Sequence, residues 1–238
     1  MGTLIKEIKI NLKDFSYKIL IGKGILKKTG YFIKRLDLGN YAYIISNSYI
    51  AKRYAGIITN SFQRYSIKSI LKLVEDTEEA KSLTNALFIL KDIVKKDNKG
   101  YLFIVALGGG VVGDLAGFIA GIYKRGIPYI QIPTTLLAQI DSSIGGKTAV
   151  DLKEAKNLVG LFYQPYLVLS DIDCLKSLDL RQLRSGLAEA IKYGIIKNGS
   201  LLNYIEANYK KLLSLDEDAI LKLVYLCAKI KAEIVQRD

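Results

Sequence analysis

The chain has 238 residues, which suits one large domain or two small ones with ample length for a buried core. Hydrophobic residues make up 50% of it and charged residues 24%, which is an ordinary globular profile. The net charge of +12 comes from scattered basic residues, without a run of like charges or a nucleic-acid motif, so we expect no nucleic-acid partner. The same charge fits either small anionic ligands or a solvated, lysine-rich surface.

The first hundred residues predict strands and helices in alternation. Residues 4–21 alternate between apolar and polar and predict a hairpin or strand pair, followed by a turn at 22–24. After that turn we expect a helix over 24–36, a strand over 41–45, the start of a helix at 49–54, a strand over 66–73 and a helix over 78–96.

The next segment continues this alternation. We expect a strand over 101–107, a glycine-rich turn over 108–113, a helix over 114–123 and a strand over 129–132. Strands and helices joined by short links are typical of βαβ units on a parallel sheet. Residues 101–123 have the length of a membrane span, but six glycines and the central Asp114 disfavour one, so we expect no membrane segment.

The last part of the chain has a helical pattern. The final strand is expected at 167–169, followed by helices over 181–197, 201–213 and 216–236. We therefore expect an α/β part over residues 1–173 and a helical part over 174–238. The last helix keeps an apolar stripe almost to Asp238 without a stop signal, as if its partner element were missing.

The cysteines and the N-terminus bear on localisation. Cys174 and Cys227 stand alone without CxxC spacing, and the first residues contain no apolar signal region. We expect a reduced, cytoplasmic protein.

The glycine-rich turn predicts an anion site. Gly108, Gly110 and Gly113 satisfy GxGxxG between a strand and a helix, where backbone N–H groups face a pyrophosphate. The motif alone is weak, because the strand over 129–132 ends in Pro-Thr-Thr without a ribose-binding acid, and a tight strand–helix turn would look the same. Asp114 fits a functional role, and it equally fits a carboxylate stabilised by the first helical turn.

A second glycine pair precedes Lys147 and Thr148. It is not a Walker motif, because Asp141 stands where that motif has its first glycine. What remains is a lysine suited to a phosphate or carboxylate, or simply a solvated turn.

The remaining candidate site residues are charged and polar side chains at helical or loop spacing. Glu189 and Lys192 share a helix face, where the carboxylate could ligate a metal and the lysine could hold an anion, or both could form a surface ion pair. Glu78 and Lys81 have the same spacing. Residues 153–157 form a polar cluster that predicts a loop followed by a helix start near 162–165. The chain has no histidine.

In combination, these motifs resemble the 3-dehydroquinate synthase family of sugar-phosphate cyclases. The resemblance runs from about residue 16 to Asp238. The segments that carry it, in order and at family spacing, are Ala106–Asp114, Arg125–Gly126, Pro133–Lys147, Lys156–Asn157, Gln164–Pro165 and Gly186–Tyr193.

The resemblance implies an α/β, Rossmann-like N-terminal domain and a helical C-terminal domain, with NAD and a divalent metal, zinc or cobalt, in the cleft between them. It implies conversion of 3-deoxy-D-arabino-heptulosonate 7-phosphate, an anionic sugar phosphate, into 3-dehydroquinate and phosphate in the shikimate pathway of aromatic amino acid biosynthesis. In that cycle a substrate hydroxyl is oxidised by NAD, phosphate is eliminated, the ketone is reduced again, and ring opening and an aldol step follow. A homodimer is also implied.

The resemblance assigns roles by position. The residues implied to contact NAD are Asp76, Glu78, Lys81, Gly110, Val111, Val112, Gly113, Asp114, Thr134, Thr135, Lys147, Lys156, Cys174 and Ser177. The implied metal ligand is Glu189. The residues implied to bind substrate are Asp141, Lys147, Asn157, Lys192 and Lys231, with Arg125 reaching the phosphate site of a neighbouring subunit.

The chain departs from the family pattern in several places. Asn47 replaces a usual aspartate at the adenosine ribose, and Thr77 and Ala155 replace usual glycines. The histidines that ligate the family's metal are absent, and one carboxylate does not make a catalytic zinc site. We therefore expect an N-terminal fragment of a longer synthase, which binds NAD weakly and does not turn over substrate.

Three alternatives remain. A related sugar-phosphate cyclase would share the glycine loop and Glu189 but close another ring. A catalytically dead NAD-binding module would explain the absence of histidine, although it would not need all of Lys147, Glu189, Lys192 and Lys231. A nucleic-acid binder rests on net charge alone.

Overall fold

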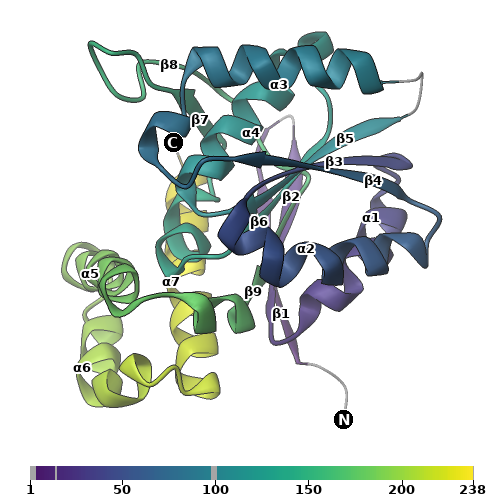
Figure 1. Ribbon diagram of the computed structural model, residues 1–238. Coiled ribbons are helices and arrows are strands. Elements are labelled where there is room, and N and C mark those ends of the chain that lie inside the picture. The colour runs from purple at the N-terminus through teal and green to yellow at the C-terminus, as the bar shows by residue number, and fades with distance from the viewer. Residues whose placement is uncertain (1–3, 14, 98–100, 238) are drawn as a thin grey trace.

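A seven-stranded sheet runs through the molecule, as the computed structural model shows for residues 4–13, 15–97 and 101–237 (Figure 1). Its strand order is β1-β2-β9-β6-β5-β3-β4. Strands β1 and β2 form the expected antiparallel hairpin, and every other neighbouring pair is parallel. The strands are β1 (Ile5–Asn11), β2 (Ser16–Gly22), β3 (Tyr41–Asn47), β4 (Lys68–Val74), β5 (Leu102–Gly108), β6 (Tyr129–Pro133) and β9 (Leu167–Asp171). The α/β class with a parallel sheet is confirmed.

Helices cover both faces of this sheet (Figure 1). α1 (Thr29–Leu36) and α2 (Ser48–Gln63) pack on one face, in a core that includes Ile44, Phe62 and Val105. α3 (Leu83–Lys96) and α4 (Gly110–Ile122) pack on the other. Strands β3 and β5 alternate their side chains between these two cores, which explains why they read as unbroken apolar runs.

Three expected helices begin elsewhere. The segment predicted as one helix over 24–36 is divided into a short 3-10 turn, η1 (Ile25–Lys28), and α1. The segment predicted as one helix over 78–96 is divided into a short 3-10 turn, η2 (Glu78–Ala80), and α3, because Ser82 caps α3 by accepting from the Asn85 N–H at 3.3 Å. The helix expected from Asp114 begins four residues earlier, at Gly110. Gly110 and Gly113 therefore lie in the first turns of α4 rather than in a loop before it.

A second, two-stranded sheet was not predicted. β7 (Lys147–Val150) and β8 (Val159–Phe162) pair antiparallel, so the helix start expected near 162–165 is wrong. Gly160 permits the close pairing, because a Cβ there would lie 2.2 Å from the Thr148 carbonyl oxygen. The Thr148 hydroxyl also donates to the Leu161 carbonyl at 2.9 Å.

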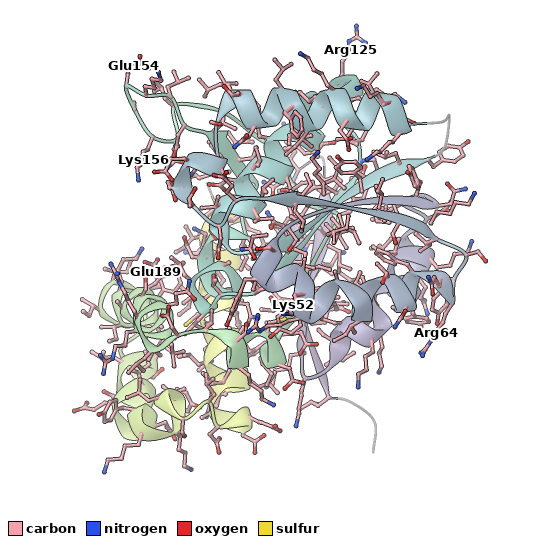
Figure 2. The ribbon with its side chains drawn as sticks, viewed as in Figure 1. Lys52, Arg64, Arg125, Glu154, Lys156 and Glu189 are labelled. Atoms are coloured by element: carbon pink, nitrogen blue, oxygen red, sulfur yellow. The ribbon has the colours of Figure 1, made fainter. Side chains whose placement is uncertain are left out.

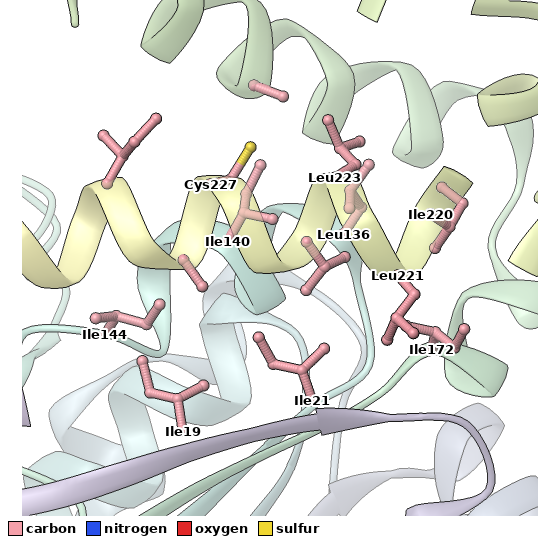
Figure 3. Close-up of a cluster of buried hydrophobic side chains, with 14 of the residues drawn as sticks. Ile19, Ile21, Leu136, Ile140, Ile144, Ile172, Ile220, Leu221, Leu223 and Cys227 are labelled. Atoms are coloured by element: carbon pink, nitrogen blue, oxygen red, sulfur yellow. The ribbon is translucent and has the colours of Figure 1, made fainter. Parts of the chain in front are cut away.

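Three helices follow the sheet: α5 (Leu180–Ile196), α6 (Gly199–Leu213) and α7 (Glu217–Val235). The apolar stripe of α7 finds its partners earlier in the chain. Leu223 and Cys227 of α7 lie in one cluster with Ile19 and Ile21 of β2 and with Ile140 (Figure 3). The helices after residue 173 thus share a core with the first two strands, and a domain boundary there stays a prediction. Among the described residues, no helix is long and apolar enough to cross a membrane.

Candidate functional site

The strand order places a crevice at the carboxyl ends of β3 and β5. The chain leaves β3 through α2 on one face of the sheet and leaves β5 through α4 on the other face. In open α/β sheets, ligands bind where the strand connections diverge in this way. Asn47 ends β3 and Gly108 ends β5, so both lie at this point.

One cleft lies at this crevice and a second lies beside it. The first cleft, of about 590 Å³, lies over the N-terminus of α4 and is bounded by residues from β3, the turn after β4, η2 and α5. The second cleft, of about 500 Å³, lies between the β7–β8 hairpin and α7. Asp114 lines both, so the two clefts meet at its side chain.

Most residues predicted to contact NAD line the first cleft, and most residues predicted to bind substrate line the second. The predicted NAD contacts that line the first cleft are Asp76, Glu78, Lys81, Gly110, Val111, Val112, Asp114, Thr134, Thr135 and Ser177. The predicted substrate contacts that line the second cleft are Asp141, Lys147, Asn157 and Lys231.

The N-terminus of α4 forms the floor of the first cleft. Its N-cap residue is Gly109, which has no side chain and so offers no capping oxygen to the first-turn N–H groups. A Cβ on Gly109 would lie 3.1 Å from Thr135 Cγ2, and one on Gly110 would lie 3.2 Å from Ser142 Oγ. Free N–H groups, a positive helix end and bare glycines together suit a pyrophosphate.

Lys81 sits at the junction of the two clefts. Its side chain is only 4% exposed, and its ammonium donates to Asn157 Oδ1 at 2.6 Å and to Asp114 Oδ2 at 3.1 Å. Glu78 and Asp151 lie 3.4 and 3.7 Å away. Burial would lower the pKa of Lys81, but the carboxylates outweigh it, so this pKa is raised and the lysine stays charged.

The ion pair with Lys81 also affects the protonation state of Asp114. Burial raises the pKa of its carboxyl to about 6, although the neighbouring Lys81 opposes that rise. A carboxyl that titrates near neutral pH at the junction of two cavities is typical of a functional site.

Asp151 organises the loop that carries Asn157. Its carboxylate accepts from the Asn157 N–H at 2.7 Å, and its own N–H donates to the Lys81 carbonyl at 2.7 Å. Asn157 has a φ of 55°, in the left-handed region that asparagine tolerates. Because Lys81 only donates, it fixes Asn157 Oδ1 as the acceptor and leaves the amide NH₂ of Asn157 free to donate.

In the second cleft, one carboxylate oxygen accepts two hydrogen bonds. Asp141 Oδ1 accepts from the Tyr193 hydroxyl at 2.5 Å and from the Lys231 ammonium at 2.6 Å. Burial alone would raise the pKa of Asp141, but these hydrogen bonds outweigh it and hold the pKa below its usual value. Asp141 lies in η4 (Ala138–Ser142), a π-helical turn of a kind that is frequent at functional sites.

Replacing Tyr193 by phenylalanine removes one of these donors without changing the packing volume. We expect Tyr193→Phe to lower the free energy of unfolding by about 1–2 kcal/mol at neutral pH and to raise the pKa of Asp141. The pKa of Asp141 is lower in the folded chain, so its contribution to stability is present above about pH 4 and is lost as pH falls through the folded value.

The stability deficit of Tyr193→Phe should therefore shrink on acidification, as measured by urea unfolding at a series of pH values. Tyr209→Phe makes the same change at an exposed position of α6 and should cost less than about 0.5 kcal/mol at every pH. A Tyr193→Phe deficit that is independent of pH would contradict the assigned hydrogen bond.

The predicted metal ligand is paired with its neighbour. Glu189 forms an ion pair with Lys192 on α5, as its spacing indicated. The nearby Cys227 thiol is buried, which raises its pKa to about 12. Within the described ranges no three His, Cys, Asp or Glu side chains are placed to hold a metal ion. These residues do not make a zinc or cobalt site, and Glu189 as a metal ligand stays a prediction.

Several predicted residues line neither cleft. Figure 2 shows Arg125 at the outer side of the molecule, far from Glu189, in a turn where its φ is 66°. Lys156 is exposed beside the clefts, 4.0 Å from Glu78. Cys174 is fully buried, so the segment over 174–177 reaches the first cleft through Ser177. Gly113 is buried against Gln131, and a Cβ on Gly113 would lie 2.8 Å from the Gln131 Oε1.

The structure also brings residues to the site that the sequence did not single out. Asp151 and Tyr193 hold predicted site residues in place, and Tyr49 and Gln182 line the first cleft. The tyrosine ends a motif that the sequence did flag, but nothing local marks its hydroxyl as a donor to Asp141, which is 52 residues away.

Family models match the chain over most of its length. The model described as 3-dehydroquinate synthase N-terminal matches residues 71–185, and the one described as 3-dehydroquinate synthase C-terminal matches residues 186–238. Curated proteins named 3-dehydroquinate synthase are similar throughout: one from Desulforamulus reducens is 42% identical over 100% of this chain, and one from Alkaliphilus metalliredigens is 44% identical over 98%. The chain spans 65% and 64% of the lengths of these relatives.

Solved structures of cyclases have the same architecture. A 2-deoxy-scyllo-inosose synthase complexed with carbaglucose-6-phosphate, NAD⁺ and Co²⁺ is 26% identical, with a TM-score of 0.88 over 97% of this chain and 62% of its own. A 2-epi-5-epi-valiolone synthase from Streptomyces hygroscopicus with NAD⁺ and Zn²⁺ is 27% identical, with a TM-score of 0.84 over 95% of this chain and 63% of its own. An iron-containing alcohol dehydrogenase from Thermotoga maritima, at 16% identity and a TM-score of 0.74, shares the fold.

Proposed function

Because this chain belongs to the 3-dehydroquinate synthase family, we propose that it carries the NAD site and the anion-binding site of a 3-dehydroquinate synthase. The observation that carries the proposal is the meeting of two clefts at Asp114, one built around a free helix N-terminus and the other around lysines. NAD, when bound, would supply the hydride acceptor for a substrate alcohol and return the hydride later.

The residues of the first cleft would bind and orient the dinucleotide. The first-turn N–H groups of α4 would bind its pyrophosphate, and the nicotinamide would extend towards Asp114 at the junction, next to the second cleft. Lys81 would hold Asp114 and Asn157 in place there, because its ammonium already bonds both. This orientation leaves the adenosine half at the end of the cleft lined by Asn47 and Asp76.

The residues of the second cleft suit a substrate with two anionic groups. Lys147 and Lys231 line this cleft and would bind a phosphate and a carboxylate. Asp141, kept ionised by Tyr193 and Lys231, would accept a hydrogen bond from a substrate hydroxyl. The amide of Asn157 would donate to the substrate. 3-Deoxy-D-arabino-heptulosonate 7-phosphate has both anionic groups and several hydroxyls.

Other parts of the activity are predictions by family resemblance alone. The described residues provide Glu189 but no complete metal site, so no step of this proposal passes through a metal. Arg125 lies outside both clefts, and a role at the phosphate site of a second subunit, with the homodimer that it requires, is proposed on the resemblance only. A cytoplasmic location and a place in aromatic amino acid biosynthesis are proposed on the same basis.

Calorimetric titration of the 238-residue chain tests the proposal. We expect binding of NAD⁺, and binding of 3-deoxy-D-arabino-heptulosonate 7-phosphate at least about tenfold tighter than glucose 6-phosphate, because the carboxylate adds a charge-assisted contact. Lys147 was predicted to contact both NAD and substrate, but it lines the second cleft and not the first. Lys147→Met should therefore weaken binding of the heptulosonate and leave NAD⁺ binding within about threefold.

Two results would contradict the proposal in different ways. Equal or tighter binding of glucose 6-phosphate would favour a cyclase that closes another ring, as in the 2-deoxy-scyllo-inosose synthase complexed with carbaglucose-6-phosphate. Binding of NAD⁺ with no binding of either sugar phosphate would favour an NAD-binding module without catalytic function.

A further inference from the structure

A third cleft lies apart from the other two, between α1 and the β1–β2 hairpin. Its volume is about 530 Å³, close to those of the first and second clefts, and it shares no lining residue with them. Its lining residues belong to β1, β2 and α1, which are drawn in purple in Figure 1, and to β9 through Leu167. The third cleft is therefore separate from both sites of the proposed function.

The walls of the third cleft are mostly apolar. Leu20 of β2 and Leu167 of β9 are buried on the face of the sheet that α1 covers, and Ile5 of β1 packs against the same core. α1 contributes the rings of Tyr31 and Phe32, which pack edge to face with their centroids 5.5 Å apart. Apolar and aromatic walls with few polar groups are typical of a cleft that binds a small organic ligand.

α1 leaves this cleft open because the helix is short. It has eight residues and ends at Asp37, which takes a left-handed conformation with a φ of 50°. Leu36, in the last turn of α1, lines the cleft and is 39% exposed, and Tyr31 is exposed to the same extent. A ligand with an apolar body would remove these side chains from water, which favours its binding.

The third cleft also contains one cation that is not neutralised. Lys18 is paired with Glu7 at 2.8 Å, whereas Arg35 has no carboxylate partner among the described residues. Arg35 Nη1 donates to the Tyr31 hydroxyl at 2.9 Å, and the guanidinium lies 5.7 Å from the Tyr31 ring centroid. The guanidinium has further N–H donors, which can bind a carboxylate through two parallel hydrogen bonds.

The apolar walls and the single free cation together specify one class of ligand. We propose that the third cleft binds a small aromatic carboxylate, with its ring between Phe32 and Leu20 and its carboxylate on Arg35. A sugar phosphate does not suit this cleft, because its hydroxyls would lie unpaired against apolar walls. The proposal adds a ligand site to the chain and does not depend on the proposed function.

An NMR titration of the full chain with 3-phenylpropanoate tests the proposal, because backbone amide shifts report both the affinity and the location of binding. We expect a dissociation constant below about 1 mM, with the largest shifts at Leu20, Phe32 and Arg35 and none at Gly110 or Lys147. The neutral analogue 3-phenylpropanamide should bind at least about fivefold more weakly, because it cannot form the charge-assisted contact. Octanoate has the charge without a ring and should bind at least about threefold more weakly.

Two variants separate the contributions of charge and shape. Arg35→Gln should reduce the preference for 3-phenylpropanoate over its amide to below about twofold. Leu36→Trp changes a partly exposed side chain, so it should fill the cleft and weaken both ligands at least about tenfold while the fold is retained. The matched controls are Arg64→Gln and Leu87→Trp, at exposed residues that do not line the cleft, and both should leave binding unchanged.

Several results would overturn the proposal. They are the absence of 3-phenylpropanoate binding, equally tight binding of the amide or of octanoate, and a full preference for the carboxylate in Arg35→Gln. Amide shifts centred on Lys147 would also overturn it, because they would place the ligand in the second cleft. A chain that binds 3-phenylpropanoate at α1 but does not bind NAD⁺ would contradict the proposed function alone, so the two failures are distinguishable.

Discussion

Lys81→Met is expected to lower the free energy of unfolding by about 3 kcal/mol at pH 8, because it leaves partly buried carboxylates without their cation. Lys81 is 4% exposed and its partners Asp114 and Asp151 are 22% and 14% exposed, so water replaces the lost ammonium poorly. The change also frees Asn157, whose Oδ1 loses its donor. Urea unfolding measures the loss.

The pH dependence of this loss identifies its cause. The pKa of Asp114 is raised to about 6 in the folded chain, above its unfolded value, so ionisation of Asp114 costs stability as pH rises. Without Lys81 that pKa rises further, and the Lys81→Met deficit should be larger at pH 8 than at about pH 5, where Asp114 is protonated. Lys156→Met, at a lysine that is 71% exposed, should cost less than about 0.5 kcal/mol. A loss below about 1 kcal/mol for Lys81→Met would contradict the assignment of Lys81 as the cation that stabilises the carboxylates of Asp114 and Asp151.

Gly110→Val is expected to weaken NAD⁺ binding at least about 100-fold, a loss of about 2.7 kcal/mol, with the fold retained. The branched side chain would stand over the first-turn N–H groups of α4, where the pyrophosphate is proposed to bind. Gly110 is the first residue of a regular helix, so valine can adopt its backbone conformation. A new Cβ would press only on Ser142 Oγ, at 3.2 Å. Calorimetry gives the affinity, and urea unfolding confirms the fold.

Gly56→Val is the matched control. Gly56 lies on the exposed face of α2, where a Cβ would meet nothing within 4 Å, so both affinity and stability should stay close to those of the unaltered chain. If Gly110→Val binds NAD⁺ as tightly as the unaltered chain, the dinucleotide does not bind over the N-terminus of α4.

The order of strands and helices could be predicted because each buried strand reads as an apolar run bounded by turn residues. The β7–β8 hairpin could not be predicted from the sequence. Its strands have four residues each, and what makes their pairing possible is the missing side chain of Gly160 against the Thr148 carbonyl, which depends on tertiary structure. The glycine motif did indicate an anion site, but it did not show that Gly110 already belongs to the helix.

The candidate site was predictable to the extent that its residues belong to local motifs. Glu78 and Lys81 look like a surface pair in sequence, and Lys81 proves to be buried because Asp114 and the loop over 151–157 close over it. No local pattern predicts that closure, because the contacts join segments 33 and 76 residues away. The commitment of Asn47 to both a helix cap and Asp76 likewise follows only from the register of β3 and β4.

A crystal structure of the chain grown with NAD⁺ and 3-deoxy-D-arabino-heptulosonate 7-phosphate would test the two-cleft proposal most directly. The proposal predicts density for the pyrophosphate at the N-terminus of α4, the adenosine ribose at Asp76, the nicotinamide at Asp114, and the substrate anions at Lys147 and Lys231. A dinucleotide bound in the opposite direction, or a sugar phosphate bound outside the second cleft, would contradict it.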